Sequence, residues 1–173
     1  MMMRILIGCL AASVLWAAPS SAHLQTQDVE YRDGDAVLQG YLAYDDAAKM
    51  PRPGVLVVHE WKGLGAYAKR RAEQLAALGY VAFAADMYGK GVYAKDHQEA
   101  AELSSVYRND RGRMRERILA ALDLLKQDPR VDPDRIAAIG YCFGGMTVLE
   151  LARSGAAVLG VVSVHGGLDT PHP

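Results

Sequence analysis

The stretch from Ile136 to Ala152, IAAIGYCFGGMTVLELA, changes abruptly from a strand pattern to a helix pattern. The apolar run that ends at Gly140 predicts a short buried strand, and a helical pattern begins at Phe143. Cys142 lies at the junction between the two, two residues from Gly140 and two from Gly144. The arrangement G-x-C-x-G between a strand and a helix indicates a nucleophile elbow, a sharp turn that presents a reactive side chain above a sheet.

The glycines have a physical reason in this interpretation. Side chains two residues before and after the corner would collide, and Gly140 and Gly144 remove them. The sulfur of Cys142 would then lie at the N-terminal end of a helix, where the helix dipole favours the thiolate. The backbone N–H of Phe143 would point to the place where an oxyanion forms. The alternative is a buried structural cysteine beside glycines that allow close packing of helix and strand.

The remaining sequence predicts an α/β fold. Residues 29–44 read as a hairpin that turns at Asp33-Gly34. After it, apolar runs that predict strands alternate with helical patterns. The apolar runs lie at 54–60, 80–89, 135–140 and 157–167. The helical patterns lie at 65–79, 95–110, 113–128 and 143–155, and a turn is expected at 132–135. Leu75 and Leu78 are expected on the inner face of one helix, and Met114, Ile118, Leu122 and Leu125 on that of another. Strands that are apolar on both faces predict a mostly parallel sheet with helices on both sides.

Composition and the first residues set limits on function and location. The chain has 173 residues and a formal net charge of −1, which does not favour nucleic acid or a membrane surface as partner. A charge at Arg4, an apolar run and the small residues before His23 predict a signal peptide over residues 1–22, and hence export to the periplasm or the medium. The run is too short for a membrane span. Cys9 would leave with this segment, so residues 23–173 would form one domain with a single thiol.

Three motifs carry a family resemblance: VVHEWKGL at 57–64, AADMYGKG at 84–91 and GYCFGG at 140–145. In order and spacing they resemble the dienelactone hydrolase family of the α/β-hydrolase fold, over nearly the whole of residues 23–173. The resemblance implies a hydrolase of small esters or lactones that uses a cysteine nucleophile, with a small-molecule substrate and no cofactor or metal. The oligomeric state stays open.

The resemblance also implies roles for single residues. Cys142 matches the nucleophile, and Glu60 matches a glutamate that interacts with the thiol. The backbone N–H groups of Trp61 and Phe143 match the oxyanion hole, with Tyr88 and Lys90 as substrate-binding residues; Lys90 lies where relatives often carry an arginine that holds a carboxylate. The alternatives without a functional role are a solvated loop lysine at Lys90 and a hydrogen-bonded strand-end carboxylate at Glu60.

Two further signals are expected to be structural. His59 precedes Glu60, but HEWKG lacks the second histidine of a zinc-binding H-E-x-x-H helix, so a strand-end histidine that is packed or partly exposed is expected there. Arginines recur between Arg108 and Arg117, but Asp110 and Glu116 interrupt them, as on a solvated helix face. A thiol redox role is disfavoured because no C-x-x-C is present.

The elbow lacks an obvious base. In this fold the triad order is nucleophile, acid, histidine, and in the resembled family the acid and histidine follow strands seven and eight. The chain is expected to end just after strand six. That apolar strand would form the edge of the sheet, without the two further strands that cover it in the family fold. The sequence therefore predicts a truncated hydrolase that lacks the last two strands. Asp169, His165 and His172 are poor substitutes because none matches the family positions. Two hypotheses stay open: a cysteine-dependent hydrolase, and an inactive remnant that at most binds a small molecule.

Overall fold

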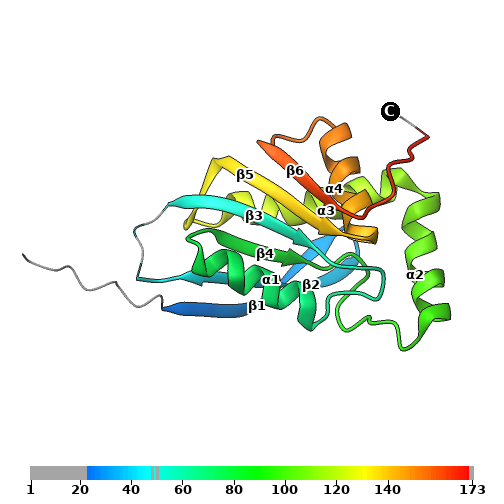
Figure 1. Cartoon of the computed structure of the whole chain (residues 1–173), viewed down its shortest axis with the longest axis horizontal. Helices are drawn as coiled ribbons and strands as arrows, with labels where there is room; N and C mark the ends of the chain where they lie inside the picture. Colours follow the sequence, from blue (N-terminus) through cyan, green and yellow to red (C-terminus); the bar gives the residue numbers. More distant parts are fainter. Residues whose placement is uncertain (1–22, 48, 50, 172–173) are drawn as a thin grey trace, which may run out of the picture.

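The computed structural model describes residues 23–47, 49 and 51–171, and the expected signal peptide lies outside them. Within these residues six strands form one sheet in the order β1-β2-β4-β3-β5-β6 (Figure 1). The chain order of the elements is β1 Leu24–Asp33, β2 Ala36–Asp45, β3 Arg52–Val58, α1 Ala66–Ala77, β4 Val81–Ala85, α2 His97–Asn109, α3 Arg111–Gln127, β5 Val131–Tyr141, α4 Phe143–Arg153 and β6 Gly160–Val164. The predicted α/β class, with a mostly parallel sheet, is confirmed.

The hairpin and the parallel part of the sheet follow the predicted pattern. β1 and β2 pair in antiparallel fashion around Gly34, whose φ of 56° is a left-handed conformation that glycine adopts without strain. β2 continues antiparallel to β4, whereas β4, β3, β5 and β6 run parallel to one another. The carboxyl ends of the parallel strands therefore meet at one edge of the sheet, where ligand sites of such sheets lie.

Helices cover both faces of this sheet. On one face the apolar stripe of α3 packs with α4 against strand side chains such as Leu56, Phe83 and Ile136. The four residues predicted for this stripe, Met114, Ile118, Leu122 and Leu125, are all buried. On the other face α1 packs against Val55, Val57 and their neighbours on β4. This two-sided burial explains why the strands are apolar on both faces.

Four local predictions need correction. The arginine run expected on a solvated helix face is partly buried, since Arg111 is 7% and Arg117 3% exposed and each pairs with a carboxylate. α1 packs through Ala68, Ala72 and Ala76, while Leu78, expected on the inner face, caps the helix and is 76% exposed. Leu78 lies past the last residue of the helix, so it is outside the face that packs on the sheet. The turn predicted at 132–135 is a bulge within β5. Pro53 of β3 pairs with Asp132, and the next residue, Gly54, pairs with Ile136, so residues 133–135 have no partner on β3. β6 is shorter than the predicted 157–167.

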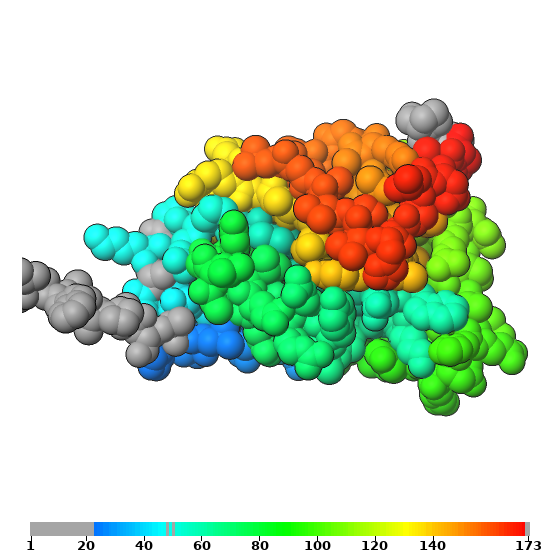
Figure 2. Space-filling view, viewed as in Figure 1, coloured from blue at the N-terminus to red at the C-terminus, as the bar shows by residue number. Residues whose placement is uncertain are grey.

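β6 is the edge strand of the described sheet. It pairs with β5, and Val162 on it is 55% exposed. The segment after β6 runs beside α4 toward the end of the molecule that carries α2 (Figures 1 and 2). Arg153 Nη2 donates to the Leu168 carbonyl at 2.9 Å, and Arg111 Nη2 pairs with Asp169 Oδ2 at 3.1 Å. These contacts attach the segment to the end of α4 and to the start of α3.

Candidate active site around Cys142

The corner between β5 and α4 has the geometry of a nucleophile elbow. Cys142 has φ 54° and ψ −111°, a conformation that is strained for any residue with a side chain. A Cβ on Gly140 would come within 1.9 Å of the Gly144 carbonyl oxygen, and a Cβ on Gly144 within 2.3 Å of the Val58 oxygen. Both glycines are therefore required for the close approach of α4 to the sheet, as the sequence predicted. The close packing at Gly140 and Gly144 holds Cys142 in this strained backbone conformation.

A cavity of about 350 Å³ opens beside Cys142. Its walls come from the loop after β3, from the start of α1, from the loop after β4 and from the corner before α4. The lining residues are Cys142, His59, Glu60, Trp61, Lys62, Gly63, Gly65, Ala66, Tyr67, Ala68 and Tyr93. Three of the residues singled out from the sequence, Cys142, Glu60 and Trp61, thus share one cavity at the carboxyl ends of the strands.

Glu60 and Trp61 lie directly after β3 and face this cavity. The Glu60 side chain is exposed, and its carbonyl accepts a bond of 3.3 Å from Gly63 N–H, which turns the loop toward α1. Phe143 is buried as the first residue of α4, so its N–H belongs to the helix-terminal donors that lack a partner within the helix. The chain thus places a carboxylate, a thiol and a helix N-terminus around one space.

Tyr88 contacts three residues around the cavity, Trp61, Phe143 and His59. Its hydroxyl donates to the Trp61 carbonyl at 2.8 Å, and its ring centroid lies 5.4 Å from that of Phe143 and 5.0 Å from that of His59. Burial raises the pKa of the phenol well above its usual range. Tyr88 is not among the residues that line the cavity, so the geometry favours a positioning role for it; the predicted substrate contact stays a prediction.

Lys90 lies apart from the cavity wall. Its ammonium group pairs with Glu30 of β1, its side chain is exposed, and its N–H donates to the Val37 carbonyl at 2.9 Å. The structure therefore ties Lys90 to the β1–β2 hairpin. Its predicted contact with a substrate carboxylate would require the Glu30 pair to open.

Of the two expected alternatives, packed or partly exposed, the structure shows the packed one for His59, although this residue also lines the cavity. It is 1% exposed; its Nδ1 lies 2.5 Å from the Glu60 carbonyl, and its Nε2 accepts from Met87 N–H at 3.2 Å. Burial lowers the pKa of this imidazole, so the neutral form with the proton on Nδ1 satisfies both contacts. With both ring nitrogens engaged, His59 is not placed to accept a proton from Cys142.

The other base and acid candidates are also not assembled. Within residues 23–47, 49 and 51–171, no histidine is hydrogen bonded to the Cys142 thiol. His165 follows β6 with a strained φ of 47° and is exposed. Asp169 is paired with Arg111, and His172 lies outside the described residues. The described residues therefore place a thiol and a helix N-terminus at the cavity, with no histidine hydrogen bonded to the thiol.

Sequence reasoning missed three lining residues, Lys62, Tyr67 and Tyr93. Lys62 lies inside the quoted motif VVHEWKGL, and Tyr93 follows AADMYGKG by two residues. Their position in the chain could have identified them, since all three lie in loops or helix starts that follow the end of a strand. In the described ranges, no group of three metal-binding side chains comes together, and none of the helices found there is long and apolar enough to cross a bilayer.

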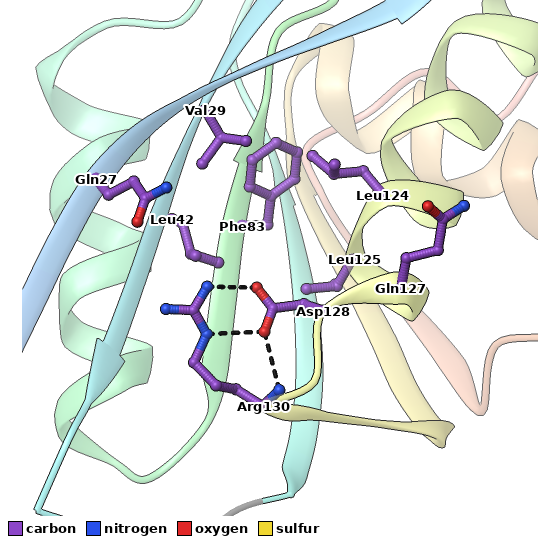
Figure 3. Close-up of a pocket in the computed structure, with 9 residues that line it drawn as sticks. All are labelled: Gln27, Val29, Leu42, Phe83, Leu124, Leu125, Gln127, Asp128 and Arg130. Carbon is purple, nitrogen blue, oxygen red and sulfur yellow. Dashed lines mark hydrogen bonds and ion pairs between the residues drawn. The ribbon is translucent and has the colours of Figure 1, made fainter.

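A second cavity, of about 150 Å³, lies between the β1–β2 hairpin and the end of α3 (Figure 3). Its wall is formed by apolar side chains such as Val29, Leu42 and Phe83, and the Asp128–Arg130 ion pair closes one side. The only acid in its wall is thus already paired, and no thiol or histidine lines it. The reactive groups gather at the Cys142 cavity instead.

Comparisons with known proteins place the chain in a family. The sequence profile of the dienelactone hydrolase family matches residues 38–173. The chain belongs to the dienelactone hydrolase family. The protein usf of Aquifex pyrophilus is 32% identical over 130 residues, which are 73% of this chain and 54% of that protein. The present chain therefore spans little more than half the length of the Aquifex protein.

Solved structures extend the likeness to the fold. A dienelactone hydrolase-like promiscuous phosphotriesterase from metagenomic libraries is 42% identical, with a TM-score of 0.82 over 86% of this chain and 63% of that one. The dienelactone hydrolase of Anabaena variabilis, at 23% identity and a TM-score of 0.63, shares the fold over 83% of this chain and 64% of its own. The range matched by the family profile, 38–173, contains the elbow and the residues that line the cavity.

Proposed function

We propose that this member of the family is a hydrolase of small esters or lactones that uses Cys142 as its nucleophile. The observation that carries the proposal is the strained corner at Cys142, held by Gly140 and Gly144 beside the cavity that Glu60 and Trp61 line. Strain of this kind persists where the surrounding structure enforces it, and it is concentrated at functional sites.

The proposed reaction begins at the thiolate of Cys142. Its sulfur attacks the carbonyl carbon, and the negative charge moves to the carbonyl oxygen, which Trp61 N–H and Phe143 N–H stabilise. The alkoxide leaves as the carbon–oxygen bond breaks, and a thioester remains on Cys142. Water then adds to the thioester, releasing the acid and restoring the thiol.

The second half of this reaction is the slower one in the proposal. A positioned base contributes about 10²–10⁴-fold to such steps, and the described residues bring no free histidine to Cys142. We therefore expect the 173-residue chain to be acylated faster than it is deacylated. A remnant that only binds small molecules would show neither step.

The test is acylation by p-nitrophenyl acetate, followed by mass spectrometry. We expect one acetyl group on Cys142, sensitive to hydroxylamine, with slow release of acetate afterwards. Cys142→Ala should lose both the label and the associated p-nitrophenol release. Acetylation at another residue, or equal release by Cys142→Ala, would overturn the proposal. Fast steady-state turnover that depends on Cys142 would instead show that a base is present, and His165→Ala would test the nearest described histidine in sequence.

A further inference from the structure

Two exposed aromatic rings lie on the wall of the Cys142 cavity. Tyr67, near the start of α1, is 42% exposed, and Tyr93, in the loop after β4, is 51% exposed. Both line the same cavity as the Cys142 sulfur. We call Tyr67 and Tyr93 together the aromatic cradle.

Tyr67 is held in place by its neighbour in the core. Its ring packs edge-on against Tyr141, with centroids 5.2 Å apart and planes at 85°. Tyr141 is buried and directly precedes Cys142, and its hydroxyl accepts from Arg71 Nε at 2.8 Å. The orientation of Tyr67 is thus coupled to the residue beside the nucleophile.

Tyr93 lies over a glycine backbone. A Cβ on Gly65 would come within 2.9 Å of Tyr93 Cε2, and a Cβ on Gly63 within 3.3 Å of Tyr93 Cδ2. The loop that carries the ring is fixed by the bond from Ala94 N–H to the Lys62 carbonyl at 2.8 Å. The two glycines therefore make room for this ring at the cavity wall.

Fixed aromatic rings offer contact area at a low cost in conformational entropy. Two such rings, exposed on one cavity wall, favour a flat apolar group that stacks on one and meets the edge of another. The charges that line the cavity are opposite, with Glu60 and Lys62 flanking Trp61, so no single charge sign dominates the wall.

We propose that the aromatic cradle selects esters or lactones that carry an aromatic ring next to the reacting carbonyl. This inference rests on the proposed function, because it assumes that the reacting carbonyl is delivered to Cys142. Tyr67 and Tyr93 act on specificity in it, and the chemistry stays with Cys142.

The test uses alkylation, which needs no base or acid beyond the thiolate. N-benzyl-2-chloroacetamide and its N-cyclohexylmethyl analogue have the same electrophile, and their rings differ in being aromatic or saturated. The Cys142 sulfur forms a bond to the methylene carbon and chloride leaves. The rate constants are measured on the full chain from the labelled tryptic peptide that contains Cys142, with iodoacetamide as a small reference reagent.

We expect the aromatic reagent to react roughly two- to ten-fold faster than the saturated one, the range expected for one or two aromatic contacts. Tyr67→Leu and Tyr93→Leu should each lower this ratio toward one, and Tyr93→Phe should retain it. Tyr80→Leu is the matched control, because Tyr80 is also exposed, at 37%, but does not line the cavity. An unchanged iodoacetamide rate shows that each variant keeps the folded site.

A wild-type ratio of one, or a ratio that survives both leucine substitutions, would overturn the aromatic cradle while leaving the proposed function intact. Failure of the proposed function gives a different result. In that case Cys142 reacts with iodoacetamide no faster than a free thiol in a short peptide, and both proposals fall together.

Discussion

The hydroxyl of Tyr88 donates a hydrogen bond to the main-chain carbonyl of Trp61 at 2.8 Å. The bond joins the loop after β4 to the loop after β3. Trp61 is the residue whose N–H is proposed to hold the oxyanion, so the position of that N–H depends on a side chain that does not line the cavity. Asp86 supports the same loop, because its carboxylate accepts from the N–H groups of Tyr88 and Gly89 at 2.9 and 3.0 Å.

Replacement of Tyr88 by Phe should therefore act through stability and positioning. We expect Tyr88→Phe to lower the free energy of unfolding by about 1 kcal/mol, the usual contribution of one hydrogen bond, and to slow acylation of Cys142. Tyr80→Phe is the control, because Tyr80 is exposed and does not line the cavity. Urea denaturation followed by circular dichroism gives the stability, and an unchanged midpoint for Tyr88→Phe would show that the bond contributes nothing in solution.

The elbow glycines should tolerate no side chain. Gly140→Ala places a Cβ 1.9 Å from the Gly144 oxygen, so the backbone must move, and we expect a loss of about 2–3 kcal/mol or more in the free energy of unfolding. Gly160→Ala, at the start of β6, meets nothing within 4 Å and should stay within about 0.5 kcal/mol of wild type. Equal stability of the two variants would mean that the tight approach of α4 is absent in solution.

Glu60 lines the same cavity as Cys142, so its negative charge should slow reactions of the Cys142 sulfur. We expect Glu60→Gln to speed alkylation of Cys142 by iodoacetamide at neutral pH. Glu73→Gln is a suitable control, because Glu73 of α1 accepts from the Tyr41 hydroxyl of β2 at 2.6 Å and does not line the cavity. Identical rate–pH profiles for wild type and Glu60→Gln would remove Glu60 from the environment of the thiol.

The features that were predictable from sequence depend on neighbours in the chain. The strand–glycine–cysteine–helix junction at 136–152 is determined by residues within two positions of Cys142, and the stripe of α3 by a regular spacing. Both appear in the structure as predicted. Local chemistry decided them, so no knowledge of distant contacts was needed.

Features that depend on distant parts of the chain were not predictable in this way. Lys90 pairs with Glu30, sixty positions earlier, because the β1–β2 hairpin passes beside the loop after β4. Tyr93 reaches the cavity because Gly63 and Gly65 leave space for its ring. The exposure of Leu78 follows from the helix ending there, a boundary that periodicity alone does not fix.

The expected signal peptide gives a prediction at the N-terminus. Cleavage between Ala22 and His23 would leave the new amino group on the residue whose backbone nitrogen donates to Asp45 Oδ1 at 2.8 Å. This bond lowers the pKa of Asp45, so the carboxylate is ready to pair with a positive terminus. We expect intact-mass analysis of exported protein to show His23, or a residue within a few positions of it, as the first residue; a protein that keeps Met1 would contradict export by cleavage.

The buried imidazole of His59 should make stability depend on pH. Burial lowers its pKa from 6.5 in the folded state, so below pH 6.5 the unfolded chain binds a proton that the folded chain does not. The free energy of unfolding should therefore be highest above pH 6.5 and should fall by up to about 1.4 kcal/mol per pH unit below it. The decrease should end where the folded state also binds the proton.

His59→Gln should remove this contribution from the slope, whatever it does to the absolute stability. His97→Gln, at an exposed histidine whose ring centroid lies 5.4 Å from that of Trp61, should keep the wild-type slope. The measurement is urea denaturation at a series of pH values from 5 to 8, with the slope below pH 6.5 as the readout. If His59→Gln and wild type lose stability in parallel as the pH falls, His59 is already charged in the fold. Its Nε2 would then be unable to accept the Met87 N–H.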